Sequence, residues 1–110
     1  MDGMNKVVLM GHLKDNPVDI PTNTGQRRCE FVIETTSYTK GENETKKKVI
    51  DSHKVKAYGK TAKACSDMLR KGSMVLVEGM LRNKQGNSYE IKADDVSFIA
   101  NYGKENKTNE

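Results

Sequence analysis

Short runs in which apolar and polar residues alternate dominate the chain, and turn-forming residues separate them. A period of two is typical of β-strands that turn one face toward a core. Glycine, proline, asparagine and aspartate mark the breaks between the runs. The pattern predicts five strands, at approximately Asn5–Leu13, Arg28–Tyr38, Lys48–Ala57, Ser73–Asn83 and Ser88–Ile99.

The predicted strands differ in what their two faces carry. The first strand has apolar residues on both faces, and so has the fourth, which predicts that the fourth is buried on both sides. In the second strand the core-facing set is Cys29, Phe31, Ile33 and Thr35. In the third strand the core-facing set is Val49, Asp51, His53, Val55 and Ala57. Its other face is basic, small and aromatic, with Ile50, Ser52, Lys54, Lys56 and Tyr58.

Between the third and fourth strands the apolar spacing changes to three and four residues. Ala62, Cys65 and Leu69 follow this spacing, which predicts a helix of about three turns with Gly72 as its C-terminal stop. The segment Thr39–Lys47 contains no apolar residue and is predicted to be a flexible polar loop.

Five strands with one helix between the third and the fourth is the element order of the OB-fold. This fold is an all-β, five-stranded Greek-key barrel, and it often binds oligonucleotides or oligosaccharides. The alternative, an SH3-like barrel, lacks a three-turn helix at that point. We expect one OB domain over residues 1–100 and a flexible tail over 101–110, where the composition becomes polar.

The chain has 110 residues and a net charge of +4. Its basic excess lies in residues 40–60, which hold seven basic and three acidic residues. A local excess of this kind favours a polyanionic partner. The apolar runs are too short to span a membrane, and the first residues show no export signal. We therefore expect a cytoplasmic protein.

Cofactor and enzyme chemistry find little support in the sequence. Cys29 and Cys65 have no CxxC partner, and His12 and His53 show no metal-ligand spacing, so we assign no cofactor and no metal. Two buried free thiols are the favoured interpretation, with a disulfide possible in principle. His53 is interpreted as a hydrogen-bonded structural histidine. No nucleophile elbow, phosphate-binding loop or zinc-protease motif is present, so the protein is not expected to be an enzyme.

Single-stranded nucleic acid needs cations for its phosphates and flat rings on which bases stack, and this sequence offers both. The candidate binding residues from the strand pattern and the charge count are Tyr38, Lys40, Lys46, Lys47, Lys48, Lys54, Lys56, Tyr58, Lys60, Arg82, Lys84 and Tyr89. Each also has a structural interpretation. Tyr58 and Tyr89 could cap the core, and Lys46–Lys48 could simply be solvated.

Four stretches in this order resemble the bacterial single-stranded DNA-binding proteins of replication. They are Met4–Leu13, Asp15–Pro17, His53–Ala62 and Leu69–Arg82, within a match over about Met4 to Ile99. The resemblance implies a non-enzymatic OB-fold homotetramer, with a dimer as the alternative, that wraps single-stranded DNA in replication, recombination and repair.

The resemblance also assigns residues. It implies stacking at Tyr38 and Tyr58 and phosphate contacts at Lys54, Lys60, Lys71, Arg82 and Lys84. Ser52 and Gly86 stand where the family often has tryptophan, so fewer aromatic rings should be available for base stacking than is usual in the family. His53 matches a family histidine near subunit contacts.

Family members usually end in an acidic, phenylalanine-terminated tip that recruits replication and repair enzymes. This chain ends at Asn109-Glu110, so we do not expect tail-mediated recruitment. A trimmed chain, a short paralogue encoded by a phage or mobile element, and a primosomal replication protein of the same fold are the alternatives. For the function, the alternatives are an RNA-binding OB module and a protein-interaction OB domain.

Overall fold

The structure, a computed structural model, describes residues 2–101, except for the side chain of Glu44. Within these residues the chain forms six strands, one α-helix and a short 3-10 turn. The elements are β1 (Val7–Leu13), β2 (Val18–Asp19), β3 (Arg28–Lys40), η1 (Glu42–Glu44), β4 (Lys46–Tyr58), α1 (Gly59–Met68), β5 (Ser73–Asn83) and β6 (Tyr89–Asn101).

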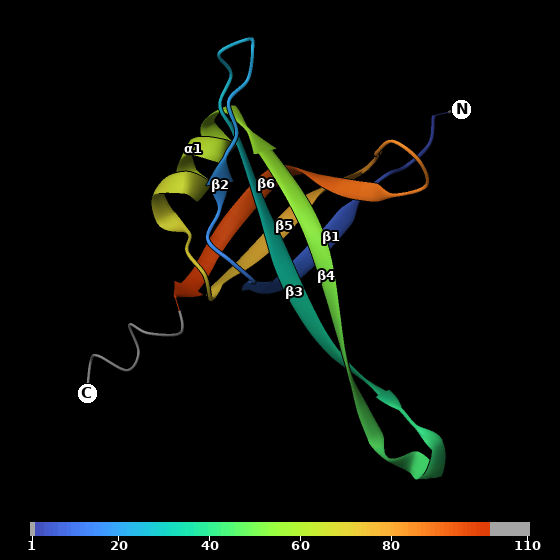
Figure 1. The fold of residues 1–110 in the computed structure, drawn as a ribbon. Coiled ribbons are helices and arrows are strands. Elements are labelled where there is room, and N and C mark those ends of the chain that lie inside the picture. The colour runs from blue at the N-terminus through green and yellow to red at the C-terminus, as the bar shows by residue number, and fades with distance from the viewer. Residues whose placement is uncertain (1, 102–110) are drawn as a thin grey trace, which may run out of the picture.

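The five long strands close into a barrel (Figure 1). Their order in the sheet is β1-β5-β6-β4-β3, with the two-residue strand β2 added beside β3, and β1 also pairs with β3. The closing contact is short, because β1 meets β3 only at His12↔Glu34 and Leu13↔Ile33. With α1 between β4 and β5, this is the OB-fold that the element order predicted.

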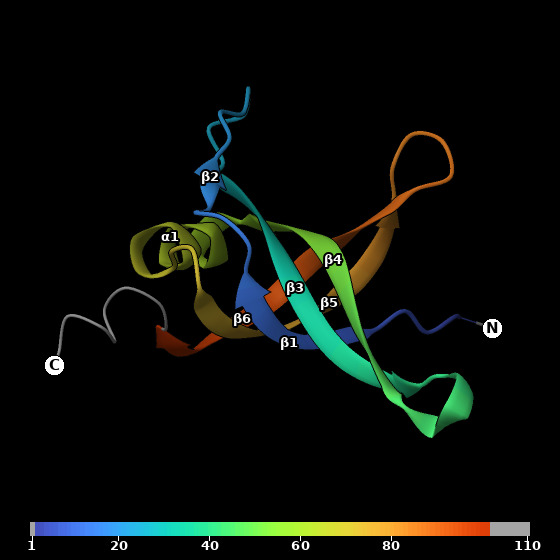
Figure 2. The ribbon, with the colours of Figure 1, turned by 60° about the horizontal axis from the view of Figure 1, so that its bottom comes forward.

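The core lies inside the barrel and beneath α1, which covers one end of it (Figures 1 and 2). The alternation of β3 and β4 is confirmed where these strands line the barrel, since Phe31, Ile33, Val55 and Ala57 are buried. The helix contributes Ala62 and Cys65, and Leu69 packs just beyond its last turn. The remaining core residues are Leu13, Cys29, Val75, Val77, Ile91 and Ala93.

Both cysteines are free and buried, as the sequence favoured. Burial raises the pKa of Cys29 to about 11 and that of Cys65 to about 12, because a buried thiolate loses its hydration. We therefore expect both thiols to stay protonated in the folded protein at pH 8 and to resist a thiol reagent such as dithionitrobenzoate. In denaturant both should react completely. Fast reaction of either thiol in the native protein, measured by absorbance, would contradict the buried arrangement.

The predicted polar loop over Thr39–Lys47 is wrong in extent. Strand pairing continues through Thr39↔Lys47 and Lys40↔Lys46, and the Gly41 N–H then donates to the Thr45 carbonyl over 2.6 Å. The pairing persists because backbone hydrogen bonds between strands need no apolar side chains. The result is a long β3–β4 hairpin that stands away from the barrel (Figures 1 and 2). Asp51 is exposed, although the alternation placed it inward, because its part of β4 lies on this hairpin.

The predicted helix stop at Gly72 is also wrong. The helix ends at Met68, and the following residue, Leu69, already has an extended backbone. Gly72 has a φ of 90°, and its N–H donates to the Leu13 carbonyl over 3.0 Å in the turn that leads into β5. The buried Ser73 hydroxyl closes this turn, because it accepts a hydrogen bond from the Arg70 N–H.

The predicted burial of β5 on both sides is not found in the single chain. One face carries the buried Val75 and Val77, whereas Met74 and Leu76 on the other face are half-buried. Leu81, on the same face as Val75 and Val77, is 41% exposed because β5 extends past the barrel there. The predicted tail falls, from residue 102 onward, outside the described residues.

Candidate nucleic-acid interface

The outer face of β4 carries the basic and aromatic residues that the alternation placed there. Lys54, Lys56 and Tyr58 occupy alternate positions, and Tyr58 lies opposite Arg28 of β3. Directly paired residues of an antiparallel ladder point to the same face. Arg28 therefore joins this face.

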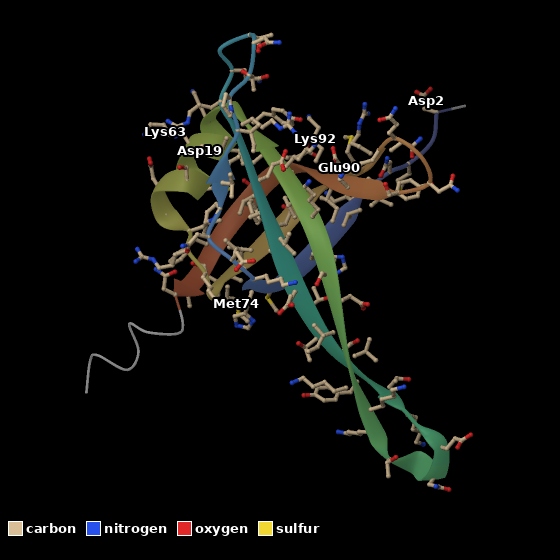
Figure 3. The ribbon with its side chains drawn as sticks, viewed as in Figure 1. Asp2, Asp19, Lys63, Met74, Glu90 and Lys92 are labelled. Atoms are coloured by element: carbon tan, nitrogen blue, oxygen red, sulfur yellow. The ribbon has the colours of Figure 1, made fainter. Side chains whose placement is uncertain are left out.

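A groove opens where this face meets the start of β6 and the end of β5. Its volume is about 600 Å³, and its walls come from the β2–β3 loop and from β4, β5 and β6. The lining residues are Gln26, Lys56, Tyr58, Met80, Arg82, Asn83, Glu90 and Lys92. The register explains the grouping, because Lys92 pairs with both Lys56 and Met80 and Arg82 pairs with Glu90. In Figure 3 Glu90 and Lys92 lie near each other at the start of β6, away from Met74 near the start of β5.

Two carboxylates partly neutralise the positive charge of this face. Glu30 contacts Arg28 and also lies 3.4 Å from the Lys54 Nζ. Burial by itself raises the pKa of Glu30, but the hydrogen bond from Arg28 and the charge of Lys54 outweigh it and hold that pKa below its ordinary value. Glu90 lies 2.6 Å from the Lys56 Nζ and 3.8 Å from the Lys84 Nζ. The cations nevertheless outnumber the acids, because Arg82 and Lys92 add two more.

The β3–β4 hairpin carries a second group of predicted residues away from the groove. They are Tyr38, Lys40, Lys46, Lys47 and Lys48, all exposed. Tyr38 pairs with Lys48, so the register places both on the face that carries Lys54 and Tyr58 nearer the barrel. Lys47 alternates to the opposite face. The hairpin thus extends the basic and aromatic face outward, with Tyr38 63% exposed.

Lys84 follows β5 and lies beside the groove, where it contacts Glu90. Three further predicted residues lie outside both groups. Lys60 is exposed in the first turn of α1, next to Tyr58 but not in the groove wall. Lys71 precedes β5, whereas Arg82 lies near its other end, about 30 Å along the strand. Tyr89 is 62% exposed and lines a neighbouring hollow of about 550 Å³ with Met4, Asn5, Leu81, Arg82 and Asn83.

Sequence reasoning missed Arg28, Lys92 and Glu90 as parts of this site. Lys92 and Glu90 had a usable signal, since they alternate with the buried Ile91 and Ala93 in β6. Arg28 had the same signal beside the buried Cys29, but only the strand register shows that it lies opposite Tyr58.

His53 lies outside the groove and is satisfied locally. Its Nε2 is 2.9 Å from the Thr35 hydroxyl oxygen, and its side chain is half-buried. This hydrogen bond confirms the structural interpretation of His53.

Other kinds of site find no support in the part of the chain that the structure describes. Among residues 2–101 no group of three or more His, Cys, Asp or Glu side chains is arranged to hold a metal ion. None of the described helices is long and apolar enough to cross a membrane.

Comparison with known proteins gives one consistent family. The sequence profile of the single-strand binding protein family matches residues 4–99. Single-stranded DNA-binding protein 1 of Chlorobaculum tepidum is 35% identical over 106 residues, covering 88% of this chain and 65% of that protein. The single-stranded DNA-binding protein of Xanthomonas axonopodis pv. citri is 36% identical over 100 residues, covering 90% of this chain and 56% of the relative. The chain thus spans somewhat more than half the length of the curated relatives that it matches.

Solved structures agree on the fold. A Plasmodium falciparum single-strand binding protein in complex with single-stranded DNA superposes with a TM-score of 0.82, at 24% identity over 91% of this chain and 98% of that one. The wild-type single-stranded DNA binding protein from Thermus aquaticus superposes with a TM-score of 0.77, at 22% identity over 91% of this chain and 52% of that one.

Proposed function

Since the chain belongs to the single-strand binding protein family, we propose that it binds single-stranded DNA without sequence preference and catalyses no reaction. It acts in the cytoplasm, as a bacterial, nucleoid-associated protein or as one encoded by a phage or mobile element, and protects exposed strands during replication, recombination and repair. The observation that carries the proposal is the basic groove beside Tyr58, continued by the basic face of the β3–β4 hairpin.

This arrangement supports a path for the DNA. Phosphates bind the cations of the groove, with Arg82 and Lys92 as the first contacts because neither is tied to a carboxylate within the described residues. Bases stack on Tyr58 and, along the hairpin, on Tyr38. Stacking requires unpaired bases, so a duplex cannot use the aromatic part of the surface.

A salt titration of binding to labelled oligo-dT tests the function. We expect tight binding that weakens as NaCl rises, with log K falling by about 0.7 per neutralised phosphate for each unit of log salt. Arg82 and Lys92 alone then give a slope of about −1.4 or steeper. Duplex DNA and RNA of equal length are the controls. Equal, weak binding of all three would reject DNA binding and favour a protein partner, and tighter binding of RNA would favour the RNA-binding alternative.

We also propose that the chain forms a homo-oligomer, with a tetramer favoured over a dimer. The outer face of β1 supports this, since Val8 and Met10 are more than half exposed and lie beside the half-buried Leu76 and Met74 of β5. Glu78 and His12 lie at the two ends of this face, and the apolar residues Val8, Met10, Leu76 and Met74 lie between them. An exposed apolar patch with a polar rim is typical of a subunit contact.

Replacing Met10 with glutamate is expected to break the assembly, because the new charge would be buried in the contact. Sedimentation analysis should show a mass of several chains for the wild type and of a smaller species for Met10→Glu. The same substitution at Met68, an exposed residue of α1, is the control and should leave the mass unchanged. A monomeric wild type would contradict the proposal.

A further inference from the structure

The two glutamates of the basic face lie directly beside its cations. Glu30 and Glu90 each contact two cations, which are Arg28 and Lys54 for Glu30 and Lys56 and Lys84 for Glu90. Six cations lie in or beside the groove, which are Arg28, Lys54, Lys56, Arg82, Lys84 and Lys92. Four of these six are therefore already paired with a carboxylate in the free protein. A carboxylate and a phosphate present the same kind of oxygen to a lysine or arginine, so each glutamate lies where a phosphate could bind.

The Glu90 pair is largely hidden from water. The side chain of Glu90 is 11% exposed and that of Lys56 is 16% exposed. Solvent screens such a pair weakly, so the attraction between Lys56 and Glu90 is stronger than that of a surface ion pair. A DNA phosphate that approaches Lys56 has to compete with this attraction.

Glu90 is nevertheless only partly satisfied. Its Oε2 contacts Lys56, but its Oε1 is buried and accepts no hydrogen bond within the described residues. Lys84, at 3.8 Å, is close enough for an ion pair and too far for a hydrogen bond. A buried oxygen without a donor is costly, so this carboxylate is not in its best environment and can be displaced.

We propose that Glu90, with Glu30 in the same role on the other side of Lys56, competes with DNA phosphates for the cations in and beside the groove and so limits affinity. The inference rests on the proposed function. If the glutamates compete in this way, some of the cations that could bind phosphates are occupied by internal ion pairs in the free protein. Binding therefore releases fewer counterions than it would if all six cations were free to contact phosphates. The lower affinity that results allows the bound protein to move along the strand.

Glu90→Gln tests the proposal by removing the charge while keeping the shape of the side chain. Binding of labelled oligo-dT is measured by fluorescence anisotropy at several NaCl concentrations. We expect about tenfold tighter binding at low salt and a log–log salt slope that is steeper by about 0.7 to 1.4, because Lys56 and Lys84 become available to phosphates. Glu30→Gln should change both quantities in the same direction, and it serves as the second variant if Glu90→Gln does not fold.

Asp67→Asn is the matched control. It also removes one negative charge from an ion pair, since Asp67 lies 2.8 Å from Lys63, but this pair is on α1 and outside the groove. It should change the affinity only slightly and leave the slope unaltered. Weaker binding by Glu90→Gln would mean that the carboxylate positions Lys56 for the DNA, and an unchanged slope would mean that it does not compete; either result overturns the inference. Failure of the wild type to bind oligo-dT would instead refute the proposed function.

Discussion

Replacing Gly79 with alanine is expected to lower the free energy of unfolding by about 3 kcal/mol or more. A methyl group at this position would lie 2.1 Å from the Lys92 carbonyl oxygen and 3.0 Å from the Ala93 Cα. Both atoms belong to the backbone of β6, which cannot move aside without breaking its pairing with β5. For a domain of this size such a loss lowers the melting temperature by about 12–24 °C, which calorimetry or circular dichroism would measure.

Gly3→Ala is the control for this substitution. No atom lies within 4 Å of the methyl group that it would add, so the melting temperature should stay near that of the wild type. If Gly79→Ala melted like Gly3→Ala, the close approach of β5 and β6 at this point would be wrong. The added methyl group would also displace the backbone of Lys92, whose side chain lines the groove. We therefore expect Gly79→Ala to bind DNA weakly even where it remains folded.

Replacing Tyr58 with alanine is expected to weaken binding to oligo-dT about 5- to 150-fold, because base–aromatic stacking contributes about 1–3 kcal/mol per base. Tyr58 has the strongest structural support among the tyrosines, since it lines the groove with Arg82 and Lys92. The loss should be visible as a change in affinity with little change in the salt slope, because the substitution removes a ring and no charge.

Tyr58→Phe separates stacking from hydrogen bonding at this position. The phenylalanine ring stacks without the hydroxyl, so this variant should bind within a factor of about 3 of the wild type if the ring carries the effect. Both variants need a melting curve, because Tyr58 is half-buried just before α1. Wild-type affinity in a folded Tyr58→Ala protein would show that the DNA does not use the groove.

Local signals in the sequence were sufficient for most of the fold. The alternation in Ser73–Asn83 predicted the bounds of β5 correctly, and Phe31, Val55 and Cys65 are buried as predicted. The errors occurred where side chains do not decide the conformation. The strands of the hairpin beyond Thr39 are paired through backbone hydrogen bonds, and a polar composition cannot reveal such pairing.

The candidate site was only partly predictable, for a related reason. Lys56 and Tyr58 could be chosen because they stand on one face of a strand with a clear alternation, and Arg82 because the family resemblance assigns it. Their assembly into one groove depends on the pairing of β4 with β6, which is parallel and joins segments far apart in the chain. The carboxylates were missed because the charge of a segment does not show which lysines are already paired.

The pairing of β1 has a consequence for how the protein is made. Val7 pairs with Gly79 and Met10 with Leu76, so β1 leaves the ribosome long before its main partner β5 exists. The β3–β4 hairpin, by contrast, joins neighbouring segments and can form as soon as its second strand is synthesised. Until β5 is made, β1 can pair with β3 only at His12 and Leu13, so most of this apolar strand stays exposed during translation and needs protection from other chains.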